Sequence, residues 1–96
     1  MNRTVWKFPL TEPSPFSLRL PVGAKVLHVA EQHGTSTLWA EVACDDDFQA
    51  AFEERTFYVV GTGDRIPDEA GSHVATWFDD PFVWHLYAPK LTYDGT

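Results

Sequence analysis

Cysteine is nearly absent from this chain of 96 residues, which contains only Cys44. No internal disulfide can form, so an apolar core must hold the chain together by itself. No histidine or lysine stands beside Cys44 to activate its thiolate. We therefore expect a small, buried or half-buried side chain at this position rather than a reactive one.

Long apolar runs are missing as well. No segment approaches the ~18–20 apolar residues that span a bilayer. The first ten residues carry Arg3 and Lys7, and they lack the apolar stretch and small-residue cleavage site of a secretion signal. The expectation is a cytoplasmic protein with no membrane partner.

Positive charge is scarce, because seven lysines and arginines face fourteen aspartates and glutamates, a formal net charge of −7. Residues 41–80 hold eleven acids against two arginines, a net charge of −9, whereas residues 1–40 have a net charge of +2. A protein needs a basic surface to neutralise nucleic-acid phosphates. We expect no nucleic-acid partner.

Signatures of catalysis and of metal binding are also lacking. The four histidines (His28, His33, His73 and His85) do not stand at the short spacings of a metal site, and no cysteine cluster accompanies them. No serine lies in the nucleophile motif of a hydrolase. We expect structural histidines, no metal, no cofactor and no assignable catalytic residue. A hydrolase built on scattered histidines and aspartates is the least favoured function.

What the chain does have is enough apolar material for one core. Hydrophobic residues make up 44% and aromatic residues 15% of the sequence, and each large ring buries roughly 150–250 Å² when packed. The length suits a single domain. We expect one β-rich domain over residues 1–96, in which 88–96 form a loose tail.

Apolar residues alternate with period two in most segments, which is typical of strands with one buried face. A hairpin loop is expected at 33–36, where Gly34 can adopt a positive φ. At most one short helix is expected, near 46–54, because Phe48, Ala51 and Phe52 have helical spacing. The expected strands are 4–10, 16–20, 24–32, 37–44, 55–61, 73–78 and 82–88. The fold class is all-β, a small antiparallel sandwich or barrel of about seven short strands.

Several of these segments also resemble a known family. The residues at 5–8, 26–29, 38–40, 60–63 and 83–85 are similar in order to those of short proteins of unknown function encoded by bacteriophages and by bacterial genomes carrying prophages. The resemblance implies a phage or prophage origin, hence the host cytoplasm, and implies no activity. The segment 45–54 is longer than the usual connection in that family.

The first candidate site is a glycine turn with an adjacent cation. Backbone amides of such a turn can hold an anion, and a guanidinium beside it can hold a phosphate or carboxylate. The Lys-Ser/Thr of a phosphate-binding loop is missing, so a plain turn is the alternative. An aromatic wall would complete a site for a nucleotide or another anionic metabolite. The candidate residues are Gly61, Thr62, Gly63, Arg65 and Trp39.

The second candidate site is the acidic segment. It can offer a negative patch to a basic partner, although a solvated loop or a hard-cation site are alternatives. The candidate residues are Asp45, Asp46, Asp47, Glu53 and Glu54.

The chain has more aromatic rings than one sheet face requires. Trp39, Tyr58, Val83 and Tyr87 fall on faces opposite to the expected core positions. Either both faces are covered, as in a barrel or a dimer, or an aromatic patch is exposed for a ligand or partner. The leading hypothesis is a small phage- or prophage-encoded accessory protein that binds a host protein non-covalently, with homodimer formation as a further option. A small-ligand binder is the second.

Overall fold

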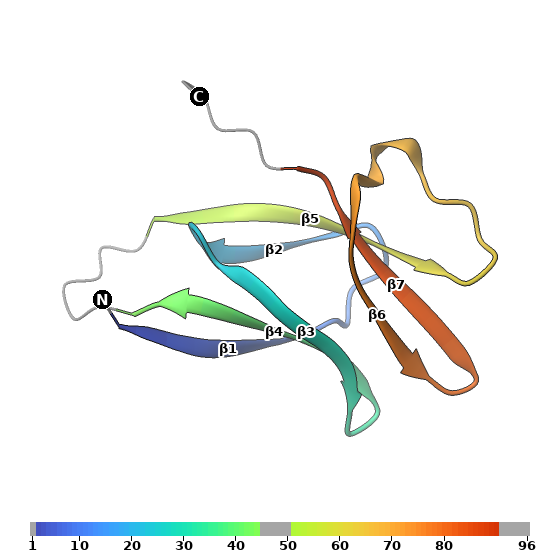
Figure 1. Ribbon diagram of the computed structural model, residues 1–96, viewed down its shortest axis with the longest axis horizontal. Coiled ribbons are helices and arrows are strands. Elements are labelled where there is room, and N and C mark those ends of the chain that lie inside the picture. Colours follow the sequence, from blue (N-terminus) through green and yellow to red (C-terminus); the bar gives the residue numbers. More distant parts are fainter. Residues whose placement is uncertain (1, 45–50, 91–96) are drawn as a thin grey trace.

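The computed structural model describes residues 2–44 and 51–90 of the chain, and these form seven antiparallel strands (Figure 1). The strands are β1 (Arg3–Pro9), β2 (Phe16–Pro21), β3 (Lys25–Gln32), β4 (Thr35–Ala43), β5 (Phe52–Gly61), β6 (Ser72–Asp79) and β7 (Phe82–Ala88). A short 3₁₀ turn, η1 (Asp68–Ala70), precedes β6. The all-β expectation is confirmed.

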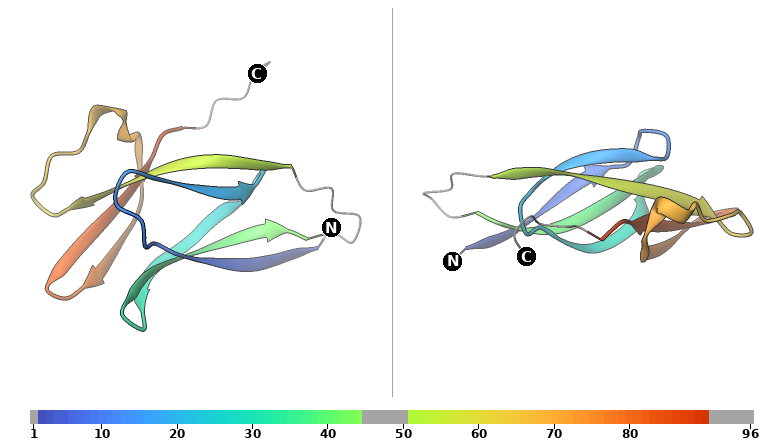
Figure 2. Two further views of the ribbon diagram at one scale, coloured as in Figure 1. Left: turned by 180° about the vertical axis from the view of Figure 1, so that it is seen from behind. Right: turned by 90° about the horizontal axis from the view of Figure 1, so that it is seen from above.

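The strands form two sheets that make a small sandwich-like domain (Figures 1 and 2). One sheet has the order β1-β4-β3 and the other the order β2-β5-β7-β6. Strand β3 of the first sheet contacts β6 of the second. Each neighbouring pair is antiparallel, so short turns suffice for the β3–β4 and β6–β7 connections.

One apolar core joins the inner faces of the two sheets. The first sheet contributes Leu38, Ala40 and Val42, whose alternation along β4 is visible in the sequence. From the second sheet, the rings of Phe16 and Phe57 stack at 5.9 Å. Burying a large apolar side chain stabilises a fold by roughly 1.5–3 kcal/mol. The remaining core residues are Leu20, Ala24, Val29, Trp77 and Leu86.

The β3–β4 turn is shorter than expected. His33 and Gly34 have φ angles of 53° and 84°, the two consecutive positive values that close a two-residue hairpin. Thr35 therefore pairs with Gln32 and belongs to β4. The expected four-residue loop at 33–36 is corrected to a two-residue turn.

Two β-bulges change the alternation of side chains. In β3 the register shifts between Val26 and His28, and in β6 it shifts between His73 and Ala75. The extra residue lets positions three apart share a face. The second bulge thereby places His73 and Thr76 on the same face of β6.

The helix expected near 46–54 is not formed by its described part, because β5 begins at Phe52. Pairing with β2 sets Phe52 opposite Pro21 and Glu54 opposite Arg19. The Arg19 guanidinium also lies over the Phe52 ring, 5.2 Å from its centroid. Cross-strand contacts thus override the helical spacing of the apolar residues. Residues 45–50 lie outside the described part of the chain.

Residue 88, the first of the expected tail, belongs to a strand. Ala88 is the last residue of β7, and a Cβ placed on Gly71 would lie 2.4 Å from its carbonyl oxygen, so the two backbones pack closely. Pro89 and Lys90 are exposed, and residues 91–96 lie outside the described ranges. No helix in residues 2–44 or 51–90 has the length and apolar character needed to cross a membrane.

Candidate functional site

The predicted glycine turn follows β5 and is hydrogen-bonded to β7. Gly61 ends β5, and Gly63 has a φ of 92°. The amide of Asp64 donates to the Gly61 carbonyl at 3.0 Å, and the amide of Thr62 donates to the Val83 carbonyl at 3.3 Å. Two amides that an anion would need are therefore already engaged within the protein.

The other two predicted ligand contacts lie apart from that turn. Arg65 points into solvent, with 81% of its side chain exposed, and its Nη2 lies 3.6 Å from Asp68 Oδ1. Trp39 is in the other sheet, on its outer face, paired with Lys7 and His28. Its ring lies 6.2 Å from that of His28. Gly61, Thr62 and Gly63 line one pocket together with His85 and Tyr87. Neither Trp39 nor Arg65 lines that pocket.

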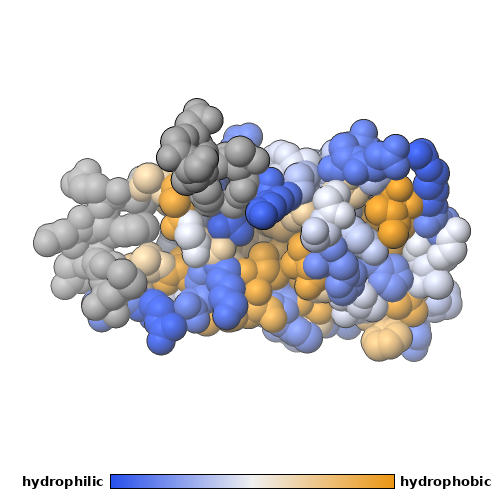
Figure 3. All heavy atoms as spheres, turned by 45° about the horizontal axis from the view of Figure 1, so that its top comes forward, coloured by the Kyte–Doolittle hydropathy of each residue, from blue (hydrophilic) through white to orange (hydrophobic). Residues whose placement is uncertain are grey.

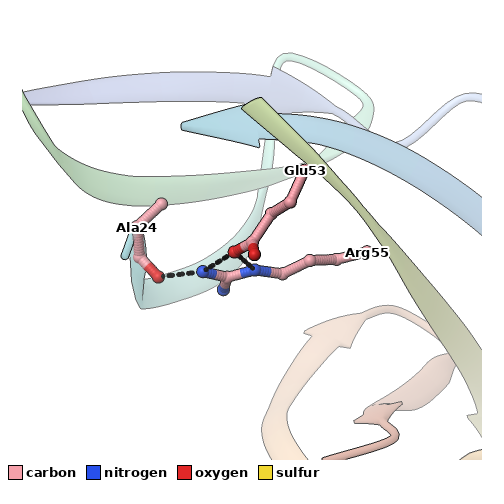
Figure 4. Close-up of polar contacts among 3 residues, drawn as sticks. All are labelled: Ala24, Glu53 and Arg55. Carbon is pink, nitrogen blue, oxygen red and sulfur yellow. Dashed lines mark hydrogen bonds and ion pairs between the residues drawn. The ribbon is translucent and has the colours of Figure 1, made fainter. Parts of the chain in front are cut away.

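Of the predicted acidic patch, only two residues lie in the described part, since Asp45, Asp46 and Asp47 do not. Glu53 pairs with Arg55, whose Nη2 is 2.9 Å from Glu53 Oε2 and also donates to the Ala24 carbonyl at 2.7 Å (Figure 4). The two side chains are only 15% and 14% exposed. Arg55, paired with Glu53, therefore ties β5 to the residue before β3, whereas Glu54 is exposed.

A chain of hydroxyl and imidazole groups crosses the outer face of β6 and β7. Thr76 Oγ1 lies 2.8 Å from His73 Nε2 and 2.9 Å from His85 Nδ1. On its other side, His85 Nε2 lies 2.8 Å from Thr62 Oγ1. The β6 bulge and the pairing of Thr76 with His85 bring these groups together.

The bonds of the Thr62 hydroxyl set the direction of the hydrogen bonds in this row of side chains. The Thr62 hydroxyl also lies 3.4 Å from the Val83 carbonyl, and if it donates its proton there, it accepts from His85 Nε2. The neutral His85 ring then accepts at Nδ1 from Thr76, which in turn accepts from His73 Nε2. In the described residues no group of three or more His, Cys, Asp or Glu side chains is placed to share a metal ion. These histidines orient one another and the Gly61–Asp64 turn.

Two exposed phenylalanines mark the end of the β6–β7 hairpin. Phe78 is 72% exposed and Phe82 is 54% exposed. Phe78 pairs with Val83 while Phe82 pairs with Asp79, so the two rings lie on opposite faces of the hairpin. The hairpin end projects from the rest of the molecule (Figures 1 and 2). The hairpin end therefore exposes one phenylalanine ring on each of its two faces.

A hollow of about 510 Å³ lies between this hairpin end and the glycine turn. The Phe82 ring stacks on the Trp84 ring, with centroids 5.2 Å apart and planes 26° apart. Apolar residues reach the surface among hydrophilic ones at the end of the molecule that carries β6, β7 and the loop before them (Figure 3). The lining residues are Gly61, Thr62, Asp64, Pro81, Phe82, Val83 and Trp84.

Acidic residues outnumber basic ones between the glycine turn and the hairpin end in the sequence. Among the lysines and arginines of the sequence, only Arg65 falls between residues 61 and 82, and it lies beside the carboxylate of Asp68. The acids of this segment are Asp64, Asp68, Glu69, Asp79 and Asp80. Asp64 lines the hollow, and Asp79 and Asp80 lie at the hairpin turn, so carboxylates flank the aromatic residues there. Asp68 and Glu69 lie in η1, before the other end of β6.

The sequence indicates these aromatic residues only as a surplus and does not place the site on them. A usable signal is present: the turn Asp79-Asp80-Pro81 is flanked by Phe78 and Phe82. A phenylalanine on each side of a polar turn cannot reach the core when the turn projects into solvent. The direction of the hairpin, which alternation does not reveal, decides this.

The family comparison covers nearly the whole chain. The family model described as Domain of unknown function (DUF7352) matches residues 1–94. No curated protein and no solved structure matches the chain significantly. The expectation of an uncharacterised family is confirmed, while a phage origin stays a prediction.

Proposed function

The chain belongs to the DUF7352 family of unknown function, and we propose that it binds a protein partner non-covalently through the end of its β6–β7 hairpin. In this proposal it is an accessory protein encoded by a phage or prophage, and it acts in the cytoplasm of the bacterial host on a host protein. The contact surface consists of Phe78, Phe82 and the half-buried Trp84.

The observation that supports the proposal is the exposure of Phe78 and Phe82, at 72% and 54%. Neither ring belongs to the core cluster, so the fold gains little from either. Each Å² of apolar surface that stays in water gives up about 25 cal/mol of the free energy that its burial would supply. Exposed aromatic residues at a projecting part of a molecule are typical of protein interfaces.

A site for an anionic metabolite is supported less well by the same geometry. The pocket lined by Val60, the glycine turn, His85 and Tyr87 has a volume of about 200 Å³, below the ~300–1,000 Å³ of usual ligand pockets. The larger hollow beside Trp84 is lined by the Asp64 side chain, whose charge repels an anion. A protein partner is the better fit.

Affinity capture from a bacterial lysate followed by measurement with the purified partner tests the proposal. We expect Phe78→Ser combined with Phe82→Ser to weaken binding of that partner at least tenfold without lowering the unfolding temperature. Leu27→Ser is the matched control, because Leu27 is 45% exposed and lies in β3 of the other sheet. We expect that control to bind the partner within twofold of the unchanged protein.

Two results contradict the proposal. One is a specific partner that binds the Phe78 and Phe82 double variant as tightly as it binds the unchanged protein. The other is a stable homodimer, seen by sedimentation, that dissociates in the double variant, because a second copy of the chain would then cover the hairpin end.

A further inference from the structure

We propose that the hollow between the Gly61–Asp64 turn and the β6–β7 hairpin receives an arginine side chain of the protein partner. This inference rests on the proposed function and names the chemistry of the partner at that surface. It requires a carboxylate and aromatic side chains that border one space, and Asp64, Phe82 and Trp84 do so.

The absence of a side chain at Gly61 lets the two groups converge. Gly61 and Trp84 are paired across β5 and β7, so they share a face of the sheet. A Cβ placed on Gly61 would lie 2.9 Å from Asp64 Oδ2 and 3.4 Å from Trp84 Cζ3. The carboxylate and the edge of the indole therefore both lie over this glycine, at the wall of the hollow.

The Asp64 carboxylate is available to a partner. Within residues 2–44 and 51–90 no hydrogen bond or ion pair engages its oxygens. The neighbouring Arg65 instead lies 3.6 Å from Asp68. An exposed carboxylate of this kind gains a charge-assisted hydrogen bond when a guanidinium approaches.

The aromatic wall favours a planar cation. The stacked rings of Phe82 and Trp84 line the hollow, and a guanidinium or ammonium that reaches the face of either ring gains about 0.5–2 kcal/mol. A guanidinium can stack flat on such a ring while its edge donates two hydrogen bonds to a carboxylate. An ammonium offers neither the plane nor the paired donors. The hollow of about 510 Å³ has room for this group.

The charge around the hollow selects the same class of partner. Asp64 lines the hollow and Asp79 and Asp80 lie at the adjoining hairpin turn, so a basic segment approaches favourably and an acidic one is repelled. An arginine flanked by apolar residues would place its guanidinium in the hollow and an apolar neighbour against Phe82. The partner is therefore expected to present a basic, apolar surface.

The chemistry can be tested without the partner, by titrating the ¹⁵N-labelled protein with N-acetyl-arginine amide. The probe for comparison is the matching citrulline amide, a neutral molecule of nearly the same shape. We expect the arginine amide to shift the amide signal of Gly61 and the indole signal of Trp84, the latter assigned with Trp84→Phe. The citrulline amide should leave both in place. Equal shifts with the two probes, or none with either, would overturn the inference.

Two variants locate the interaction. Asp64→Asn should abolish the arginine-dependent shifts, and Glu54→Gln, which alters an exposed acid elsewhere in β5, should not. Gly61→Ala should also abolish them, because its methyl group occupies the space between the carboxylate and the indole. Shifts that survive both Asp64→Asn and Gly61→Ala would contradict the assignment.

The same variants separate this inference from the proposed function. If the double variant at Phe78 and Phe82 loses the partner while Asp64→Asn and Gly61→Ala keep full affinity, the hairpin binds a protein but the arginine assignment is wrong. If the arginine amide binds as described and no partner is ever captured, the hollow recognises guanidinium and the proposed function fails. A tenfold loss of partner affinity in Asp64→Asn supports both.

Discussion

The indole nitrogen of Trp77 in β6 donates a hydrogen bond of 2.9 Å to the hydroxyl oxygen of Ser36 in β4. The bond joins the two sheets, and the Trp77 side chain is almost completely buried, at 4% exposure. It satisfies the one polar atom that this large ring brings into the core. Trp77, the residue before the exposed Phe78, is therefore held against the other sheet.

Ser36→Ala should lower the free energy of unfolding by about 1–2 kcal/mol, because it leaves the indole N–H without a partner inside the protein. Urea denaturation provides the measurement. Ser17→Ala is the control, since the Ser17 hydroxyl bonds to Thr56 at 3.3 Å in an exposed position and should matter by less than about 0.5 kcal/mol. Equal effects of the two substitutions would show that the Trp77 bond does not tie the sheets together.

Arg55→Met should lower the free energy of unfolding by about 2–4 kcal/mol, because it leaves the poorly exposed Glu53 carboxylate without its guanidinium. It also removes the hydrogen bond to the Ala24 carbonyl. Replacing both Glu53 and Arg55 by leucine should cost less than Arg55→Met alone, because the carboxylate is then removed together with its guanidinium. Thermal and urea unfolding of the three proteins check this order, and a double variant that is the least stable would reverse the interpretation.

Two glycines with positive φ should respond differently to alanine. Gly71 has a φ of 83°, and an added Cβ would lie 2.4 Å from both the Ala88 oxygen and the Pro89 Cα. Gly63 has a φ of 92°, with nothing within 4 Å of an added Cβ. Gly63→Ala should cost about 1–2 kcal/mol from the left-handed backbone alone. Gly71→Ala should cost clearly more, and unfolding free energies that rank the two in the opposite order would contradict the packing of Gly71 on the end of β7.

The hydroxyl–imidazole chain predicts a single tautomer for His85. Because Thr62 accepts from Nε2 and Thr76 donates to Nδ1, neutral His85 should carry its proton on Nε2. Long-range ¹H–¹⁵N spectra at pH 8 distinguish the two ring nitrogens. Thr76→Val removes the donor to Nδ1 and should give a mixture of tautomers. A proton on Nδ1 in the unchanged protein would show that the chain runs in the other direction.

Much of the architecture can be predicted from the sequence because side-chain alternation reports burial directly. Alternation predicts the last strand, 82–88, with its observed bounds, and Leu38, Ala40 and Val42 are in the core as expected. The bulges in β3 and β6 could not be predicted, since one inserted residue changes the face of every side chain after it without changing composition. The early start of β5 at Phe52 depends on pairing with β2, which a local pattern cannot reveal.

The candidate site was only partly predictable. The sequence identifies the glycine turn, but the role of that turn differs from the one expected, because Gly61 makes room for a carboxylate and an indole. Trp39 is a suitable wall for a ligand by its chemistry, yet the strand order places it in the other sheet. Residues that meet only through sheet topology, such as Asp64 and Trp84, leave no mark in a linear sequence.

Site-specific photo-crosslinking tests the central claim most directly, because it captures the partner whatever its identity. A benzophenone amino acid at position 78 or 82 should crosslink one and the same host protein in living cells. The same amino acid at position 27 or 22, which are also exposed but lie outside the hairpin, should not. A crosslinked protein obtained equally from position 27, or none from positions 78 and 82 at any time in the growth of the host, would contradict binding through the β6–β7 hairpin.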